Sequence, residues 1–200
     1  MDRINRVYIV RHGQVKGYEN FPIYGNTDVD LTEIGALQME HMSDRLRLVE
    51  PKAIYSSDLK RASTGARLIS RYHEVPVYFL PDLRELYFGD WEGLTMSEIR
   101  KRFPEELKNR KDDLIHFSPP GRGESIRFFS ERITKCFGQI LEEQAGNDII
   151  IVAHGGVNRV ILCGALGLDL SNMFNIHQDY GCLNIIDYFS DLTLVRLVNG

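Results

Sequence analysis

The chain has 200 residues, of which 43% are hydrophobic, and a formal net charge of −4 at pH 7. This length suits one packed domain rather than two independent cores, and the interspersed charges form no basic stripe of the kind that binds nucleic acid. A small molecule is therefore the expected partner. Three widely spaced cysteines, Cys136, Cys163 and Cys182, predict reduced thiols rather than a disulfide framework or a zinc site.

The apolar run near the N-terminus is too short for a signal peptide, and no stretch of about 18 apolar residues could span a bilayer. We therefore expect a cytoplasmic protein that does not associate with membranes. The sequence does not fix the oligomeric state, and a homodimer is one of the states left open.

Short apolar strands alternate with amphipathic helices along the chain. In chain order the predicted elements are a strand at 7–10, a helix at 31–46, a strand at 52–57, a helix that begins near 59, a strand at 75–80, a helix that begins near 125, a strand at 148–153 and a hairpin of strands at 182–189 and 193–198. Thr32 is expected to cap the first helix, and Ser57 or Asp58 the second. This alternation predicts a three-layer α/β/α sandwich with a mostly parallel central sheet.

Residues 81–122 interrupt the alternation with proline-bearing loops and the charged run RKRFPEELKNRKDD. We expect a single domain over 1–200 in which about 81–122 form a cap or lid outside the main core. Basic residues of this segment could contact further acidic groups of a ligand, although most basic side chains are solvent-exposed and the pattern does not say which points inward. They are Arg100, Lys101, Arg102, Lys108, Arg110 and Lys111.

Two predicted strands end in a histidine followed by glycine. The first runs into Arg11, His12 and Gly13, and the strand at 148–153 runs into His154 and Gly155. In open α/β sheets ligands bind outside the carboxyl ends of the strands, and glycine lets the backbone approach a ligand closely. These two histidines are therefore candidate site residues. The other histidines are interpreted as structural or surface residues: His41, His73, His116 and His177.

The sequence lacks the motifs of several other kinds of catalytic site. A zinc site would need a third and usually a fourth ligand, and neither HExxH nor a Cys/His cluster is present. The GxxxxGK[ST] phosphate loop and the GxSxG elbow of serine hydrolases are also absent. What remains is a histidine that attacks phosphorus and carries the phosphoryl group covalently. Such chemistry needs cationic donors around three phosphoryl oxygens, and Arg11 and Arg61 are candidates.

Six sequence blocks occur in the order and approximate spacing of a known superfamily: VRHGQ, DVDLTEIG, IYSSDLKRA, ELYFGDWEG, GES and VAHGGVNR. On these blocks the chain resembles the histidine phosphatase superfamily of phosphoglycerate mutase-like proteins, over essentially its whole length. Dispersed blocks in this order are far more specific than RHG alone. The resemblance implies a metal-independent phosphomonoesterase that needs no cofactor.

The family pattern implies a role for each matching residue. His12 would be the phosphorylated nucleophile, and Arg11, Arg61 and His154 would form the phosphate pocket. Glu85, in ELYFGDWEG, would be the general acid that protonates the leaving oxygen and then activates water. The same five residues would therefore carry both binding and catalysis.

The chain departs from the family pattern at several positions. Val15 replaces the usual threonine after RHGQ, and Asn20, the nearest match to the family's phosphate-binding asparagine, lies two positions late. Gly65 replaces a threonine in the second helix, and Ala153 stands where serine or threonine often precedes the second histidine. Gly155 would still donate its backbone N–H to a phosphate oxygen. None of these changes removes a catalytic group, so an active enzyme is expected.

Several activities occur within the family. The stretch after Glu85 lacks the histidine-tyrosine-glycine run of the mutases and resembles the phosphatase branch. Within that branch, ELYFGDWE and YGCLNIIDYF resemble the α-ribazole-5′-phosphate phosphatases of cobalamin assembly. We expect a phosphomonoesterase for a small phosphorylated metabolite, with α-ribazole 5′-phosphate as one candidate. The alternatives are a broad-specificity or fructose-2,6-bisphosphatase-like phosphatase, a phosphoglycerate mutase, and a protein that binds a phosphorylated ligand without turnover.

Overall fold

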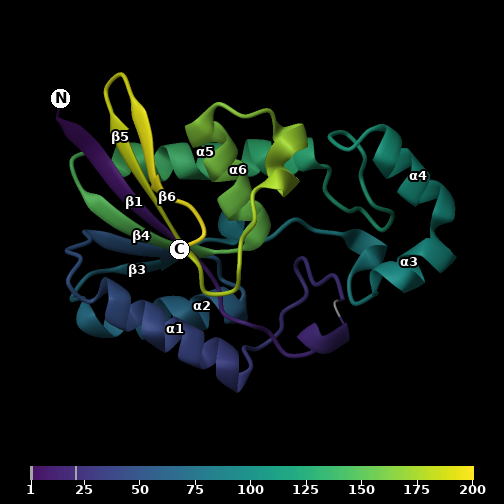
Figure 1. The fold of residues 1–200 in the computed structure, drawn as a ribbon, viewed down its shortest axis with the longest axis horizontal. Helices are drawn as coiled ribbons and strands as arrows, with labels where there is room; N and C mark the ends of the chain where they lie inside the picture. The colour runs from purple at the N-terminus through teal and green to yellow at the C-terminus, as the bar shows by residue number, and fades with distance from the viewer. Residues whose placement is uncertain (1, 21) are drawn as a thin grey trace.

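The computed structural model describes residues 2–20 and 22–200, which form a six-stranded sheet with helices on both faces (Figure 1). The strands are β1 (Arg3–Arg11), β2 (Ala53–Ser56), β3 (Val77–Phe79), β4 (Asp148–Ala153), β5 (Leu183–Phe189) and β6 (Thr193–Leu197). The helices are α1 (Glu33–Leu46), α2 (Lys60–Ile69), α3 (Met96–Arg102), α4 (Pro104–Asp112), α5 (Ile126–Glu143) and α6 (Gly155–Leu166). The strand order is β3-β2-β4-β1-β5-β6, in which β1 to β4 are mutually parallel and β5 is antiparallel to β1 and β6. The predicted α/β/α sandwich with a mostly parallel sheet is confirmed.

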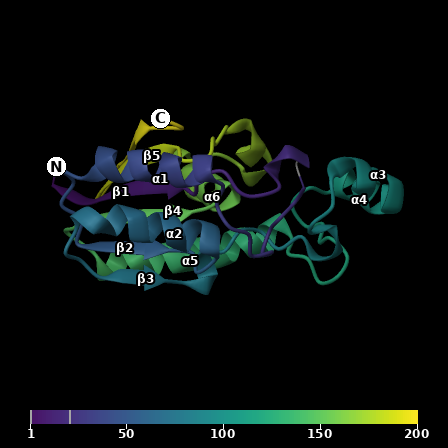
Figure 2. The ribbon, with the colours of Figure 1, turned by 90° about the horizontal axis from the view of Figure 1, so that it is seen from below.

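Side chains of the central strands alternate between two hydrophobic cores. In β4, Ile149 and Ile151 belong to the core that includes α5 and α6, whereas Ile150 and Val152 belong to the core that includes α1 and α2. Figures 1 and 2 show these helix pairs on opposite faces of the sheet. Because both faces are covered, the strand is a continuous apolar run in the sequence.

The register between β1 and β4 sets the positions of the two candidate histidines. Arg11 pairs with Ala153 at the carboxyl ends of these parallel neighbours. The next residues are His12 and His154, and the His12 N–H donates to the Ala153 carbonyl at 3.0 Å. Both histidines therefore leave the sheet side by side at its carboxyl edge.

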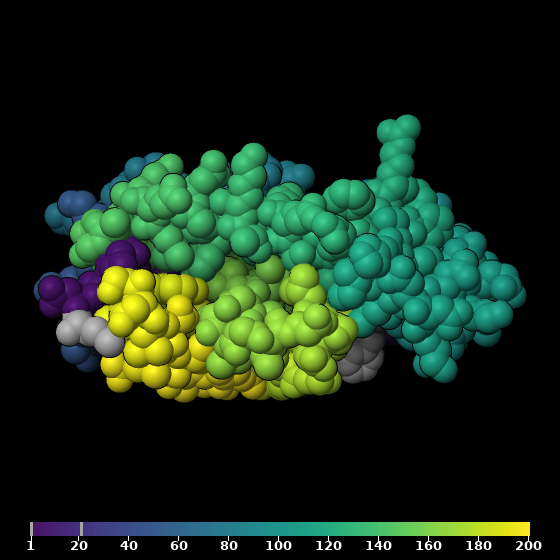
Figure 3. Space-filling model, turned by 90° about the horizontal axis from the view of Figure 1, so that it is seen from above, coloured from purple at the N-terminus to yellow at the C-terminus, as the bar shows by residue number. Residues whose placement is uncertain are grey.

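The segment 81–122 carries α3 and α4 and extends beyond one end of the sheet, opposite the end where β1 begins (Figures 1 and 3). Trp91, which is 1% exposed, stacks on Phe117 with ring centroids 5.6 Å apart, and Ile99 of α3 is fully buried. The segment thus has a small packed centre of its own. Within residues 2–20 and 22–200, no helix is both long enough and apolar enough to cross a bilayer.

The N-terminus of α2 differs from the prediction. Neither Ser57 nor Asp58 caps it: the Ser57 hydroxyl accepts the N–H of Leu59, before the helix, at 3.3 Å, and the Asp58 carboxylate accepts two hydrogen bonds from Arg84. Asp28, from the long loop before α1, accepts the Lys60 N–H at 2.8 Å instead. A residue from a distant segment therefore provides the hydrogen bond that the sequence pattern assigned to a local one.

The loop after β1 packs against the first turn of α1 through two glycines. Thr32 caps α1 as predicted, and its hydroxyl accepts the Gly35 N–H at 2.9 Å. A Cβ atom built on Gly35 would lie 2.0 Å from the Gln14 carbonyl oxygen, and one built on Gly13 would lie 2.1 Å from the Gly35 carbonyl oxygen. The strand-end loop can approach α1 this closely only because both residues lack a side chain.

We expect Gly35→Ala to lower the free energy of unfolding by about 1–3 kcal/mol, the usual cost of overpacking a close contact. Gly138→Ala in α5 is the matched control, because nothing lies within 4 Å of its Cβ position. Removing that helical glycine should raise stability by up to about 1 kcal/mol. Urea unfolding of both variants tests the pair, and a Gly35→Ala protein as stable as the wild type would contradict the contact.

Candidate active site

His12 and His154 lie together in the interior at the carboxyl edge of the sheet. Their ring centroids are 5.1 Å apart and the rings are inclined at 63° to each other. His12 is 5% exposed and His154 is fully buried. The structure thus brings together the two histidines that end separate strands in the sequence.

The hydrogen bond of His12 fixes its tautomer. Its Nδ1 lies 2.8 Å from the carbonyl oxygen of Gly13. Because a carbonyl oxygen only accepts, Nδ1 carries the hydrogen, and the lone pair of Nε2 is available for nucleophilic attack. Burial, and then the charges of Arg11 and Arg61, hold the pKa of His12 well below its usual range. The ring is therefore neutral at neutral pH, which is the form a nucleophile requires.

His154 is buried with both ring nitrogens free. Neither nitrogen has a hydrogen-bond partner among the described residues. Burial lowers its pKa most, and Arg61, His12 and Arg11 lower it further. Buried polar atoms are nearly always paired in native proteins, so this ring is placed to bond with a ligand.

Arg11 and Arg61 are both held by backbone carbonyls. Arg61, which is 2% exposed, donates to the carbonyls of Gly25 and Thr27. Arg11 donates through Nη1 to the carbonyl of Gln178. Carbonyl oxygens carry no net charge, so these anchors leave both guanidinium charges available to an anion.

Tyr180 adds an aromatic wall beside Arg11. The guanidinium carbon of Arg11 lies 4.1 Å from the centroid of the Tyr180 ring, within the range of a cation–π interaction. The same ring lies 5.6 Å from that of His12. Tyr180 therefore borders both the nucleophile and one of its cations.

Glu85 reaches the site from the loop after β3. Its Oε2 accepts the Gly156 N–H at 2.9 Å, in the first turn of α6, and its Oε1 accepts the next backbone N–H along the chain at 2.8 Å. A Cβ built on Gly156 would lie 2.1 Å from Oε1, so this approach requires glycine. Arg84, the neighbour in sequence, pairs with Asp58 rather than with Glu85. The carboxylate is therefore at the helix start and not in a surface ion pair.

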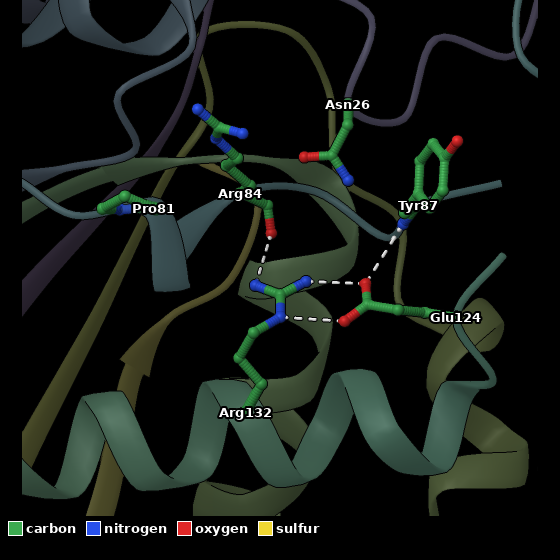
Figure 4. Close-up of a pocket in the computed structure, with 6 residues that line it drawn as sticks. All are labelled: Asn26, Pro81, Arg84, Tyr87, Glu124 and Arg132. Atoms are coloured by element: carbon green, nitrogen blue, oxygen red, sulfur yellow. Dashed lines mark hydrogen bonds and ion pairs between the residues drawn. The ribbon is translucent and has the colours of Figure 1, made fainter. Parts of the chain in front are cut away.

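An ion pair between Glu124 and Arg132 holds the backbone on both sides of Glu85 (Figure 4). Arg132 donates to Glu124 through Nε and Nη2 at 2.9 and 2.7 Å. Its Nη1 donates to the Arg84 carbonyl at 3.1 Å, and Glu124 accepts the Tyr87 N–H at 3.2 Å. Since the two held groups flank Glu85, the pair restricts the backbone that carries the carboxylate. The surface hollow in Figure 4 is lined by Asn26, Pro81, Arg84, Tyr87, Glu124 and Arg132.

Glu92, the last acid of FGDWEG, organises the loop that anchors Arg61. Its carboxylate accepts the N–H groups of Asn26 and Thr27, both at 2.7 Å. Asn26 in turn donates through Nδ2 to the Glu85 carbonyl at 3.3 Å. One carboxylate thus links the loop of an arginine to the loop of the candidate acid.

The two remaining predicted residues have different surroundings. Gly155 is the first residue of α6, where backbone N–H groups have no partner within the helix. Asn20 is exposed, and its backbone N–H donates to Gly17 at 3.3 Å. No hydrogen bond joins the Asn20 side chain to another candidate residue in the described part of the chain. A phosphate contact of Asn20 stays a prediction.

Several residues that contribute to the site were not predicted: Asn26, Glu92, Glu124, Arg132, Gln178 and Tyr180. Gln178 and Tyr180 lie just before β5, the antiparallel neighbour of β1. Knowledge of that pairing would have placed them beside Arg11, but the hairpin pattern alone does not reveal it. Within residues 2–20 and 22–200, no group of three or more His, Cys, Asp or Glu side chains is arranged to hold a metal ion.

Comparisons with known proteins identify the family of the chain. The family model of the histidine phosphatase superfamily (branch 1) matches residues 7–200. The adenosylcobalamin/alpha-ribazole phosphatase of Escherichia coli (strain K12) is 27% identical over 195 residues, which cover 98% of this chain and 96% of the relative. A metal-independent phosphoserine phosphatase of Arabidopsis thaliana is 34% identical over 160 residues, which cover 79% of this chain and 67% of the relative.

A solved structure shows the same fold. The crystal structure of the alpha-ribazole phosphatase from Shigella flexneri matches with a TM-score of 0.89 at 28% identity, covering 98% of this chain and 96% of that one. The family match extends over nearly all of the chain, from β1 to its last residue. The chain belongs to the histidine phosphatase superfamily (branch 1).

Proposed function

We propose that the protein is a phosphomonoesterase that hydrolyses a small phosphorylated metabolite through a phosphohistidine on His12. The observation that carries the proposal is a neutral His12 with a free Nε2. Its ring lies 5.1 Å from that of His154, and it feels the charges of Arg11 and Arg61, which donate to backbone carbonyls rather than to carboxylates. Membership of the superfamily supports the same activity.

In the first half-reaction, Nε2 of His12 forms a bond to phosphorus while the bond from phosphorus to the leaving oxygen breaks. Arg11 and Arg61 stabilise the charge on the phosphoryl oxygens, and backbone N–H groups at the start of α6 add hydrogen bonds. Glu85 gives a proton to the leaving oxygen, so the alcohol departs uncharged.

In the second half-reaction, Glu85 is a carboxylate and takes a proton from water as the water oxygen attacks phosphorus. The bond between His12 and phosphorus breaks, which restores the lone pair of Nε2 and releases inorganic phosphate. The pair formed by Glu124 and Arg132 keeps Glu85 in position for both proton transfers.

The substrate is an ester of phosphate with an alcohol, and the names of relatives suggest candidates for that alcohol. α-Ribazole 5′-phosphate and phosphoserine are two candidates, taken from the names of the relatives in E. coli and Arabidopsis. We infer that residues 81–122 act as a cap that contacts the substrate beyond its phosphate. This inference is supported by α3 and α4, which extend past the end of the sheet opposite to the start of β1 (Figure 2).

Replacing His12 with alanine tests the mechanism. His12→Ala should lower hydrolysis of p-nitrophenyl phosphate by about four orders of magnitude or more, because the nucleophile is lost. His41→Ala is the matched control, since His41 is exposed on α1. Rapid-quench labelling should trap an acid-labile phosphoenzyme in the wild type and none in His12→Ala.

Three results would contradict the proposal. Full hydrolysis by His12→Ala would exclude the phosphohistidine. A wild type that binds phosphorylated ligands but yields no phosphoenzyme would be a binding protein. Movement of phosphate between the carbons of phosphoglycerate, in preference to its release, would indicate a mutase.

Glu85→Gln should slow turnover by about 10²- to 10⁴-fold, because the proton donor is removed. The affinity for inorganic phosphate should change little, because the arginines and His154 remain. Steady-state kinetics and phosphate inhibition measure the two effects, with Glu105→Gln on the exposed surface of α4 as the control. Equal losses of turnover and phosphate affinity would assign Glu85 a structural role.

The stability of the protein should fall as the pH drops through the histidine range. His12 and His154 have depressed pKa values when folded, whereas unfolded histidine titrates near pH 6.5. Below that pH the unfolded chain binds protons that the folded chain does not. The free energy of unfolding should therefore decrease by up to about 1.4 kcal/mol per pH unit for each histidine.

Urea unfolding between about pH 7.5 and about pH 5.5 measures this slope. His12→Gln removes one of the two groups and should make the slope shallower. Burial also lowers the pKa of His73, but that residue contributes equally to both proteins. Equal slopes for the wild type and His12→Gln would contradict a buried neutral His12.

A further inference from the structure

Arg159 lies next to the phosphate-binding residues. It is the last residue of the block VAHGGVNR, but neither the roles implied by the resemblance nor the proposed mechanism uses its side chain. It follows Gly155 by one turn of α6, and its Nε donates to the Ile176 carbonyl at 2.8 Å. A Cβ atom built on Gly155 would lie 3.1 Å from Nη1 of Arg159 and 3.4 Å from Nε of Arg11. Two guanidinium groups therefore lie close to the same point at the helix start.

Arg110 approaches the same region from the segment 81–122. Of the six basic residues in the run that includes α3 and α4, it is half-buried and the other five are exposed. Its guanidinium carbon lies 5.7 Å from the centroid of the Phe174 ring, and that of Arg159 lies 5.9 Å from the same centroid. In Figure 3 the yellow-green surface that includes residues 170–175 lies against the teal surface of the segment 81–122. Arg110 of α4 and Arg159 of α6 thus both lie near the ring of Phe174.

Neither guanidinium is neutralised by a neighbouring acid. Within the described residues, neither Arg110 nor Arg159 has a carboxylate oxygen within ion-pair distance, even though Glu106 precedes Arg110 by one helical turn. Burial lowers the pKa of both groups, and the charge of Glu85 opposes this effect at Arg159. Partly buried arginines are usually paired, since removing an unpaired charge from water costs free energy. Unpaired cations beside a phosphate pocket are suited to a second negative group on the ligand.

We propose that Arg110 and Arg159 bind a carboxylate of the substrate, so that the enzyme prefers phosphomonoesters that carry a carboxylate a few bonds from the phosphate. This inference rests on the proposed function. The planar fork of a guanidinium matches the two oxygens of a carboxylate. Arg159 is close enough to Arg11 for one small molecule to span both. α-Ribazole 5′-phosphate has no carboxylate and phosphoserine has one, so the proposal favours esters of the second kind.

Two substrates that differ only in this group test the proposal. O-phospho-L-serine carries a carboxylate, and O-phosphoethanolamine has hydrogen in its place. We expect the wild type to show a kcat/KM ratio of about tenfold or more in favour of phosphoserine, the size of one hydrogen bond to a charged group. Arg110→Gln and Arg159→Gln should bring the ratio toward one, and Arg159→Lys should restore part of it. Lys108→Gln, at an exposed position on α4, should leave the ratio unchanged.

The outcomes separate this inference from the proposed function. If the wild type hydrolyses p-nitrophenyl phosphate and forms the phosphoenzyme but shows no preference between the two substrates, the carboxylate site is wrong and the mechanism stands. A preference that persists in both Arg110→Gln and Arg159→Gln would also overturn the site. If the wild type forms no phosphoenzyme and hydrolyses none of the three esters, the proposed function fails and the inference fails with it.

Discussion

The parallel register between β1 and β4 is the constraint on which the rest of the site depends. Because Arg11 pairs with Ala153, His12 and His154 follow at the same level of adjacent strands, and their ring centroids lie 5.1 Å apart. A shift by one residue would turn every side chain of β1 to the opposite face of the sheet. Both faces are covered by apolar cores, so such a shift would bury the wrong side chains on each side. The hydrophobic pattern of two strands therefore fixes the distance between the two histidines.

The arginines of the pocket are held in a way that preserves their charge. Two arginines outside the pocket, Arg6 and Arg84, pair with carboxylates. Arg11 and Arg61 instead donate to backbone carbonyls, which fix the guanidinium groups without neutralising them. The low dielectric of the interior makes this costly for the protein alone and strengthens the attraction for a phosphate. Burial lowers the pKa of His12 most, and the positive field of Arg11 and Arg61 lowers it further, so the buried, cationic pocket forms both the anion site and the neutral nucleophile.

Sequence reasoning succeeded where position follows from local pattern. Apolar periodicity located the six strands, the helices α1, α2 and α5 and the layers, and the two histidines directly follow apolar runs. It did not locate α3, α4 or α6. The role of Glu85 was predicted only from the family resemblance. Its carboxylate meets α6 through a contact with Gly156, a residue 71 positions away in the sequence. The features that were not predicted depend on contacts between distant segments. Asp28 supplies the hydrogen bond to the start of α2, and Tyr180 lies beside Arg11 because β5 pairs with β1. A hairpin pattern cannot reveal that pairing, because an alternating strand fits several partners equally well.

The fold separates the chemistry from the choice of ester. The candidate nucleophile and its arginines sit on strand ends and helix starts that cannot move without disturbing the sheet. The segment 81–122 lies between β3 and α5 and packs around Trp91, and its Arg110 lies 5.7 Å from the ring centroid of Phe174, which follows α6. Substitutions on α4 can therefore change the group recognised beyond the phosphate while the register of β1 and β4 stays intact. Such a division is compatible with relatives of this chain that are named for esters as different as α-ribazole phosphate and phosphoserine.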